Sequence, residues 1–456
     1  MSSSTPPPDG IDPEQPSPGG DGASGFTNGD SSLETGSTGS HEPLTDTAAA
    51  EPMMGTTATP ADAETAQGKT TGTTTEVPPE KVRYYWIDNL RATINLWVVV
   101  HHAAVSYGML PVWFYYEAPK TGDEDGAALL DLFVLVNHSW FMGTLMLIAG
   151  YFVPRSLDKK GGKRFIRDRI VHLGGPLLLY LVVLRPISLI QVWENFSATN
   201  PGVPFWVFYL GSWTVGHMWF VVRLFYFSAI YVLWRYLRQR HLDQLAAAGI
   251  EPKKPFYLSR PGYLAVIAFT IGLALVEYVW RIFVPTDSGS SILGLPSADL
   301  LPQYAAFFII GVMVQRFKWD MWISAKAGWI AAIVAFIFGF GLIPFLNIGD
   351  NAGYGTLASL IMTIWQAVLV VGINIPAIAL FQRFGDFTNW LMRFYTRNAF
   401  AVYVTHAVTM VFTGYLLAPV DQPVIVKTVL LSIISIPASW IVAAGFRAVP
   451  GLKKIF

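Results

Sequence analysis

Residues 87–108 have the sequence IDNLRATINLWVVVHHAAVSYG, in which a long apolar stretch is interrupted by a few ionisable residues. It is long enough to cross the apolar core of a bilayer as a helix, which takes roughly 17–25 residues. It nevertheless contains Asp88, Arg91 and two histidines. Ionisable side chains are costly inside a membrane unless they face protein or water. The segment therefore predicts a membrane helix with one functional face.

Similar apolar stretches follow along the chain. Of the 456 residues, 52% are hydrophobic and only 14% are charged, which excludes a single soluble globule. We expect an all-α, polytopic integral membrane protein with about ten transmembrane helices. The expected spans are 87–108, 131–153, 172–193, 217–238, 263–284, 299–315, 325–346, 357–380, 397–418 and 424–446. The absence of cysteine excludes disulfides, thiolate metal sites and a cysteine nucleophile.

The connecting loops predict the orientation of these spans. Lys and Arg collect in cytoplasmic loops, and here they fall in every second loop. The opposite loops contain only Lys120 and Lys427 as cations. An even number of spans with both termini in the cytoplasm satisfies this alternation.

The first eighty residues differ from the rest of the chain. They consist mainly of Ser, Thr, Gly, Pro, Ala and acidic residues, with Phe26 as the only aromatic residue. Such a segment cannot bury enough apolar surface to offset its conformational entropy. We expect 1–80 to be a disordered acidic tail and 81–456 to be the membrane domain.

The polar residues of the first span share one side of the helix. At about 100° per residue, and with Arg91 at zero, Asp88, Asn95, His102 and Ser106 fall between roughly 20° and 60°. His101 falls near 280°, so the pattern favours His102 over its neighbour. Arg91 and His102 are about 16 Å apart along the axis and would contact different parts of one elongated ligand. The alternative is a structural Asp88–Arg91 pair with a histidine that only bonds a neighbouring helix.

Other histidines are expected at a similar depth in the outer half of the membrane. His138 lies early in the second span, His217 opens the fourth and His406 lies in the ninth. Each alone is compatible with simple packing, but together they suggest a polar cavity in which a neutral imidazole acts as a general base. Metal ligation is the other interpretation, but no span has an HxxxH spacing. We therefore predict no metal site.

A basic stretch follows the second span. Residues 155–169, RSLDKKGGKRFIRDR, contain more cations than orientation requires. They indicate either lipid headgroup binding or a cytoplasmic site for a phosphate-bearing ligand. A phosphate site there and a base near the other side of the membrane would need a long, thin tether between them.

Several short motifs occur in the order found in acyltransferase family 3 membrane proteins, which the chain resembles over roughly 84–456. They are Asp88-Asn-Leu-Arg91 with His102, FMGTLMLIAGYF at 141–152, RIVHLGGP at 169–176, GHMWFV at 216–221, FFIIG at 307–311 and RNAFAVYVTH at 397–406. The ending PGLKKIF at 450–456 and the LGGP motif are most similar to the branch of the glucan-modifying succinyltransferase C protein.

This resemblance implies transfer of an acetyl or succinyl group from cytoplasmic acyl-coenzyme A to a hydroxyl of a sugar or similar acceptor. His102 would be the general base, or would carry the acyl group itself, and Arg91 would orient the base or the donor while Asp88 holds its guanidinium. The donor phosphates would bind Lys163, Arg164, Arg167 and Arg169. The acceptor side would be lined by Trp140, His217, Trp219 and His406. Relatives commonly have RxxR before the proline, whereas this chain has Arg169-Ile-Val-His172, so either Arg164-Phe-Ile-Arg167 substitutes for that motif or the contact is reduced here.

Two other classes of protein remain open from the sequence. A secondary transporter would also show buried charges on alternating spans, although no matching pair of broken segments is evident. A membrane scaffold would leave the polar side of the first span without a purpose. We expect acyl-coenzyme A, a hydroxyl acceptor and the bilayer as partners, and no nucleic acid.

Overall fold

A computed structural model describes residues 84–251, 257–284, 295, 297–346 and 355–456. These residues all belong to the unit Pro79–Phe456. The expected tail at 1–80 lies outside the described residues.

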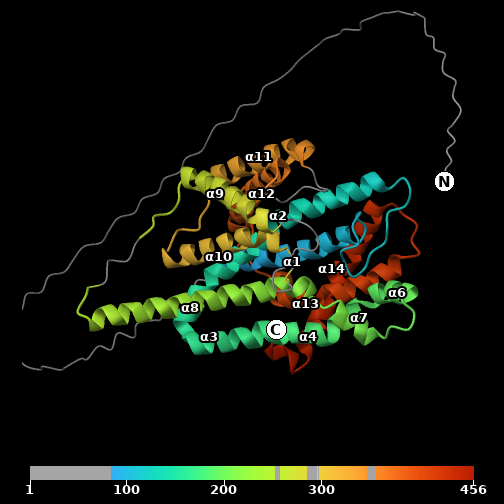
Figure 1. Cartoon of the computed structure of the whole chain (residues 1–456), viewed down its shortest axis with the longest axis horizontal. Coiled ribbons are helices and arrows are strands. Elements are labelled where there is room, and N and C mark those ends of the chain that lie inside the picture. Colours follow the sequence, from blue (N-terminus) through green and yellow to red (C-terminus); the bar gives the residue numbers. More distant parts are fainter. Residues whose placement is uncertain (1–83, 252–256, 285–294, 296, 347–354) are drawn as a thin grey trace, which may run out of the picture. The chain divides into compact units, whose positions relative to one another are not determined.

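Helices account for most of the described structure (Figure 1). The α-helices are α1 (Tyr85–Val105), α2 (Glu124–Lys160), α3 (Gly162–Arg169), α4 (Gly175–Leu179), α5 (Arg185–Ser188), α6 (Ile190–Thr199), α7 (Phe205–Gly211), α8 (Trp219–Ala247), α9 (Tyr263–Phe283), α10 (Leu301–Arg316), α11 (Ala325–Gly341), α12 (Leu357–Phe384), α13 (Trp390–Leu417) and α14 (Val424–Ala448). Two π-helical segments, η1 (Ile170–Gly174) and η2 (Tyr180–Leu184), and the short 3₁₀ turns η3 (Gly216–Met218), η4 (Ala298–Leu300), η5 (Ile343–Phe345) and η6 (Leu452–Lys454) join them.

The helices confirm an all-α polytopic membrane protein. Within the described ranges, eight helical segments are long and apolar enough to cross a membrane. The remaining two expected spans correspond to α1, which carries the polar side chains, and to α11, which has only 17 residues. A helix suits a bilayer because it satisfies its own backbone hydrogen bonds where no water is present. The sequence did not predict α7, and only the first residues of α6 fall within the expected span 172–193.

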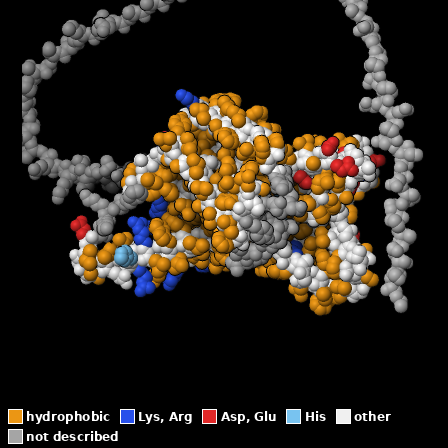
Figure 2. All heavy atoms as spheres, turned by 45° about the horizontal axis from the view of Figure 1, so that its top comes forward, with side chains coloured by type: hydrophobic (Ala, Val, Ile, Leu, Met, Phe, Trp, Pro, Cys, Tyr) orange, Lys and Arg blue, Asp and Glu red, His pale blue; other side chains and the backbone are white. Residues whose placement is uncertain are grey.

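The surface of the molecule agrees with this assignment. Large apolar side chains are exposed along α9 and α11, where a soluble protein would carry polar ones. Figure 2 shows a face that is mostly hydrophobic, with most of the visible Lys and Arg side chains near one end and a group of Asp and Glu side chains near the other.

Helix α1 lies inside the bundle, where it packs against α2, α12, α13 and α14. Helix α2 also packs along α10, and glycine allows their backbones to touch. A Cβ atom on Gly150 would collide with the Phe308 carbonyl, and one on Gly311 would collide with the Leu147 carbonyl. This close crossing fixes α2, one of the helices that pack against α1, on α10.

The third span is a continuous but irregular helix from Gly162 to Ser188. It changes from α to π geometry at Ile170 and again at Tyr180, on either side of Gly174, Gly175 and Pro176. Such π segments are rare and often occur at functional sites. Here the second segment places the fully buried Tyr180 against the ring of His217, with ring centroids 4.7 Å apart.

Candidate functional site

The expected polar residues of the first span lie on one regular helix. Because α1 is continuous from Tyr85 to Val105, the separation of about 16 Å between Arg91 and His102 holds. Arg91 donates to Asp88 at 3.3 Å, and its side chain keeps 44% of its surface exposed. Asn95 is buried between the two levels. The guanidinium is therefore held in place but still open to a ligand.

Five histidines gather at the other end of α1, and we call them the histidine cluster. They are His101, His102, His138, His217 and His406. The His102 ring stacks on the His406 ring with centroids 5.3 Å apart, and His406 contacts His217 at 4.7 Å. The structure thus brings together side chains from α1, α2, η3 and α13. Within the described residues, no group of three His, Cys, Asp or Glu side chains is arranged to hold a metal ion.

The two neighbouring histidines of α1 point in different directions. His102 faces α13 and the loop after α1, where its ring lies parallel to the indole of Trp113 with centroids 3.6 Å apart. His101 faces α2, against Phe141 at 5.1 Å and His138 at 6.3 Å. The division follows from the 100° step between successive helical residues.

His406 has a defined tautomer in its neutral form. Its Nδ1 lies 2.9 Å from the Tyr403 carbonyl and 3.2 Å from the Val402 carbonyl, so Nδ1 carries the proton. The lone pair is then on Nε2, which is buried and has no hydrogen-bond partner among the described residues. A buried hydrogen-bond acceptor without a donor lowers the stability of the fold, and a substrate hydroxyl at this position would donate to Nε2.

The loop between α1 and α2 holds Trp113 against His102. Two contacts anchor this loop beyond the indole. Lys427, only 2% exposed, donates to both carboxylate oxygens of Glu117 at 2.6 and 2.7 Å. Gln191 of α6 bonds both the amide and the carbonyl of Tyr116, at 2.7 and 3.0 Å. The anchored loop therefore closes one side of the histidine cluster.

Tyr115 strengthens the same anchor. Its hydroxyl donates to Glu117 at 3.2 Å. Burial, and secondly the Glu117 carboxylate, raise the pKa of Tyr115 above its ordinary value, so the hydroxyl keeps its proton and remains a donor. Sequence reasoning missed Trp113 and this loop, because an aromatic residue in a loop carries no periodic signal. The only available signal was Lys427, one of two cations on the expected non-cytoplasmic side.

His217 is fixed by a backbone turn that requires glycine. Gly216 has a φ of +51°, and a Cβ atom there would collide with the Tyr180 hydroxyl and lie 3.1 Å from Phe114 Cζ. The Tyr403 hydroxyl donates to the His217 carbonyl from the opposite side. Both ring nitrogens of His217 are buried and without a partner in the described part of the chain.

The expected donor-binding residues lie on α3 but do not all share a face. Lys163, Arg164 and Arg167 are exposed, and Lys163 and Arg167 are one helical turn apart on the same side. Arg169 is half-buried, and its guanidinium lies over the Phe165 ring at 5.1 Å. A phosphate group can therefore meet Lys163 and Arg167 together, whereas Arg169 faces the packed side of the helix.

The two expected acceptor-side tryptophans have different surroundings. Trp140 is half-buried in the apolar core, and no ring contact joins it to a histidine among the described residues. Trp219 stacks at a tilt on Tyr304, with centroids 5.3 Å apart, and the Arg223 guanidinium lies 4.6 Å from its ring. Trp219 thus belongs to a polar group beside the histidine cluster.

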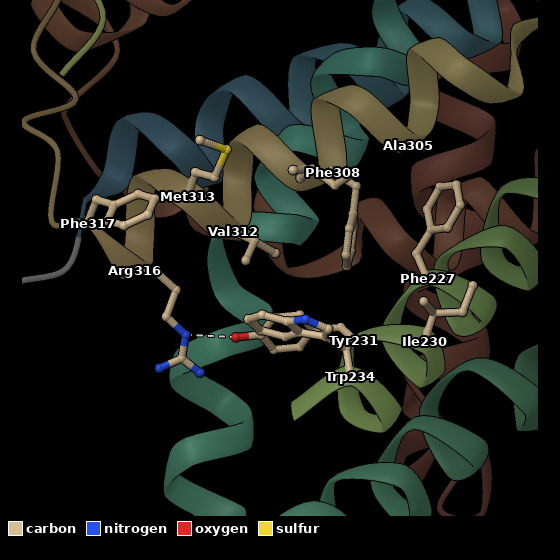
Figure 3. A pocket seen from close by; sticks show the side chains of 11 residues that line it. Phe227, Ile230, Tyr231, Trp234, Ala305, Phe308, Val312, Met313, Arg316 and Phe317 are labelled. Carbon is tan, nitrogen blue, oxygen red and sulfur yellow. Dashed lines mark hydrogen bonds between the residues drawn. The ribbon is translucent and has the colours of Figure 1, made fainter. Parts of the chain in front are cut away.

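A separate groove of about 500 Å³ lies between α8 and α10 (Figure 3). Its walls are apolar apart from Tyr231 and Arg316, and Arg316 Nε donates to the Tyr231 hydroxyl at 2.7 Å. Arg316 also forms a fork with Asp158, at 2.6 and 3.0 Å. The lining offers few hydrogen bonds to a polyhydroxylated ligand, so this groove is a poor site for a sugar.

Comparison with known proteins identifies the family. Residues 84–444 match the family profile Acyltransferase 3, described as an acyltransferase domain. No curated protein and no solved structure matches the chain at a significant level. The matched range contains every helix from α1 to α13 and most of α14. The chain therefore belongs to acyltransferase family 3.

Proposed function

We propose that this protein is a membrane-bound O-acyltransferase that moves an acetyl or succinyl group from acyl-coenzyme A to a hydroxyl of a glycan or related acceptor. One structural observation supports this reaction in more detail than family membership does. The α1 helix presents a held but accessible Arg91 at one level and His102, stacked on Trp113 and facing His406, about 16 Å further along. That separation is of the order of the pantetheine arm of the donor.

His102 is the general base in this proposal. An imidazole nitrogen removes the proton of the acceptor hydroxyl, and the oxygen attacks the thioester carbonyl. The carbon–sulfur bond breaks, and the histidine returns the proton to the departing thiolate. An ester and a free thiol result, with no net gain or loss of protons. The indole of Trp113 under the ring favours the transient imidazolium through a cation–π interaction.

The donor phosphates bind on the opposite side of the membrane. Lys163, Arg164 and Arg167 provide exposed cations, and Arg91 orients the arm above them. In this proposal α3 and both termini lie on the cytoplasmic side, which is the orientation that the loop cations predict. The acceptor approaches His102 from the other side.

One contact supports the succinyltransferase C branch, because it joins the two sequence features that resemble this branch. A Cβ atom on Gly175, in the LGGP motif, would lie 3.0 Å from Ile455 Cγ2 in the C-terminal motif. The final residue, Phe456, contacts Phe400 with ring centroids 6.2 Å apart. The two sequence features that resemble this branch therefore pack against each other, as parts of one structural unit.

The test uses the purified protein in lipid with radiolabelled acetyl- or succinyl-coenzyme A and a soluble glucose oligosaccharide. The His102→Asn variant should lose at least about a hundredfold in kcat, the usual contribution of a general base. The matched His101→Asn variant should keep kcat within about tenfold, because that ring faces α2. Equal losses from the two substitutions would refute the assignment of His102.

A further inference from the structure

A second polar cluster lies next to the histidines, and the reaction above does not use it. It consists of Arg223 on α8, Glu277 and Arg281 on α9, Asp299 in η4 and Tyr304 on α10, and we call it the Glu277 cluster. Glu277, Arg281 and Tyr304 are 0% exposed. Charged side chains are rarely so deeply buried in a membrane protein without a function.

Several buried polar atoms of the cluster make no hydrogen bond within the described residues. Arg281 donates through one terminal nitrogen to Asp299 at 3.4 Å and to Gln366, but its Nε and other terminal nitrogen have no partner. Both carboxylate oxygens of Glu277 and the hydroxyl of Tyr304 are also unpartnered within the described residues. Each buried polar atom left in this state costs about 1–3 kcal/mol. The orphaned atoms include both donors and acceptors.

The cluster has an aromatic wall and adjoins the histidines. The Arg223 guanidinium lies 4.6 Å from the Trp219 ring and 5.2 Å from the Tyr304 ring. Trp219 begins α8 directly after the η3 turn that holds His217. On the other side, His138 stacks near His101 at 6.3 Å, and Gln303, which precedes Tyr304, donates to the carbonyl of Ser139, which follows His138, at 2.9 Å.

We propose that the Glu277 cluster binds the polar body of the acceptor, an uncharged polyhydroxylated molecule such as a sugar, with its reactive hydroxyl at His102. This inference rests on the proposed function. Sugar hydroxyls both donate and accept hydrogen bonds, which matches the mixed orphaned atoms, and sugar faces pack on aromatic rings. Two acidic and two basic side chains balance in formal charge, so the site favours a neutral acceptor over an anionic one.

Two substitutions that preserve side-chain size test the proposal. Glu277→Gln and Tyr304→Phe should each raise the KM for a glucose oligosaccharide at least about tenfold. The KM for acyl-coenzyme A and its hydrolysis without acceptor should remain unchanged. Glu251→Gln, on the exposed connection after α8, is the matched control and should behave like the wild type.

Oligosaccharide binding without any donor, followed by tryptophan fluorescence, provides a second measurement. Weaker binding by both variants, with unchanged melting temperatures, supports the acceptor site even if the wild type transfers no acyl group and the proposed function fails. Wild-type affinity in both variants overturns the inference while leaving the proposed function intact. Parallel losses in melting temperature and in affinity for donor and acceptor indicate a purely structural network and also overturn it.

Discussion

Replacing Gly216 with alanine should damage the histidine cluster without touching a histidine. The substitution adds a Cβ atom at a φ of +51°, which costs a non-glycine residue about 1–2 kcal/mol. The new atom also collides with the Tyr180 hydroxyl, and Tyr180 is fully buried against His217. The tyrosine ring must therefore move, and its neighbour in the histidine cluster is His217.

The substitution has two effects that can be measured separately, the backbone strain at positive φ and the collision with the Tyr180 hydroxyl. Gly249 has a φ of +69° and nothing within 4 Å of a built Cβ, so Gly249→Ala should show the strain alone. An ordinary contact at Gly216 requires the Tyr180 hydroxyl to shift by about 1 Å, and misplacement of this size at an active site costs up to about a hundredfold in rate. We expect Gly216→Ala to lower kcat by about ten- to a hundredfold and Gly249→Ala to leave it unchanged.

A second substitution should reverse most of this loss. Tyr180→Phe removes the oxygen that collides and leaves the ring carbon Cζ at 3.4 Å, so the tightest remaining contact is Phe114 Cζ at 3.1 Å, which needs a shift of only a few tenths of an ångström. The hydroxyl has no hydrogen-bond partner among the described residues, so Tyr180→Phe alone should cost little. The measurement is acyl transfer by each variant in lipid, with thermal melting alongside. If Gly216→Ala and Gly249→Ala are equally active, or if Tyr180→Phe fails to rescue, the steric explanation is wrong.

Three further predictions concern the loop and the donor. Glu117→Gln should lower the free energy of unfolding by about 3 kcal/mol, because it leaves the buried Lys427 unpaired, whereas Lys427→Met should lower it by about 1 kcal/mol, because Glu117 is 27% exposed and can be hydrated. Thermal melting measures both losses, and equal losses would contradict this explanation. Trp113→Leu should lower kcat about tenfold with little change in the KM for acyl-coenzyme A, because it removes the indole under His102; wild-type kinetics would count against the cation–π contribution. Arg167→Glu should raise the KM for acyl-coenzyme A about tenfold but not that for acyl-pantetheine, which lacks the nucleotide phosphates; equal effects on both donors would place the phosphates elsewhere.

The features that depend on helical periodicity, namely the membrane spans and the directions of side chains on α1, were predicted from the sequence. The apolar stretches predicted the spans, and the 100° step along α1 predicted that His102 and His101 face different neighbours, as their contacts show. The common depth of His138, His217 and His406 followed from counting residues from the ends of their spans. These inferences need only local geometry and the thickness of the bilayer.

The sequence did not predict what depends on helices meeting in three dimensions. Trp113 contacts His102 because the ion pair between Glu117 and Lys427 anchors its loop, and these two residues are more than 300 positions apart in the chain. Lys163 and Arg169 lie on different sides of α3, as their helical phase requires, but counting the basic residues of this stretch does not show it. Glu277 and Arg281 did carry a signal, because a carboxylate and a guanidinium one turn apart are unusual within an apolar span.

The pair of histidines on α1 connects these observations. Successive side chains on a helix diverge by about 100°, so one helix can supply neighbouring residues to two sites. His102 contributes to the cluster with His406, while His101 contacts His138 on α2, and α2 packs against α10, which carries Tyr304 of the Glu277 cluster. If the first site performs the chemistry and the second binds the acceptor, loss of His101 should raise the acceptor KM and loss of His102 should lower kcat. In that case, the different orientations of the two histidines explain how an acceptor bound at α9 and α10 presents its hydroxyl at α1.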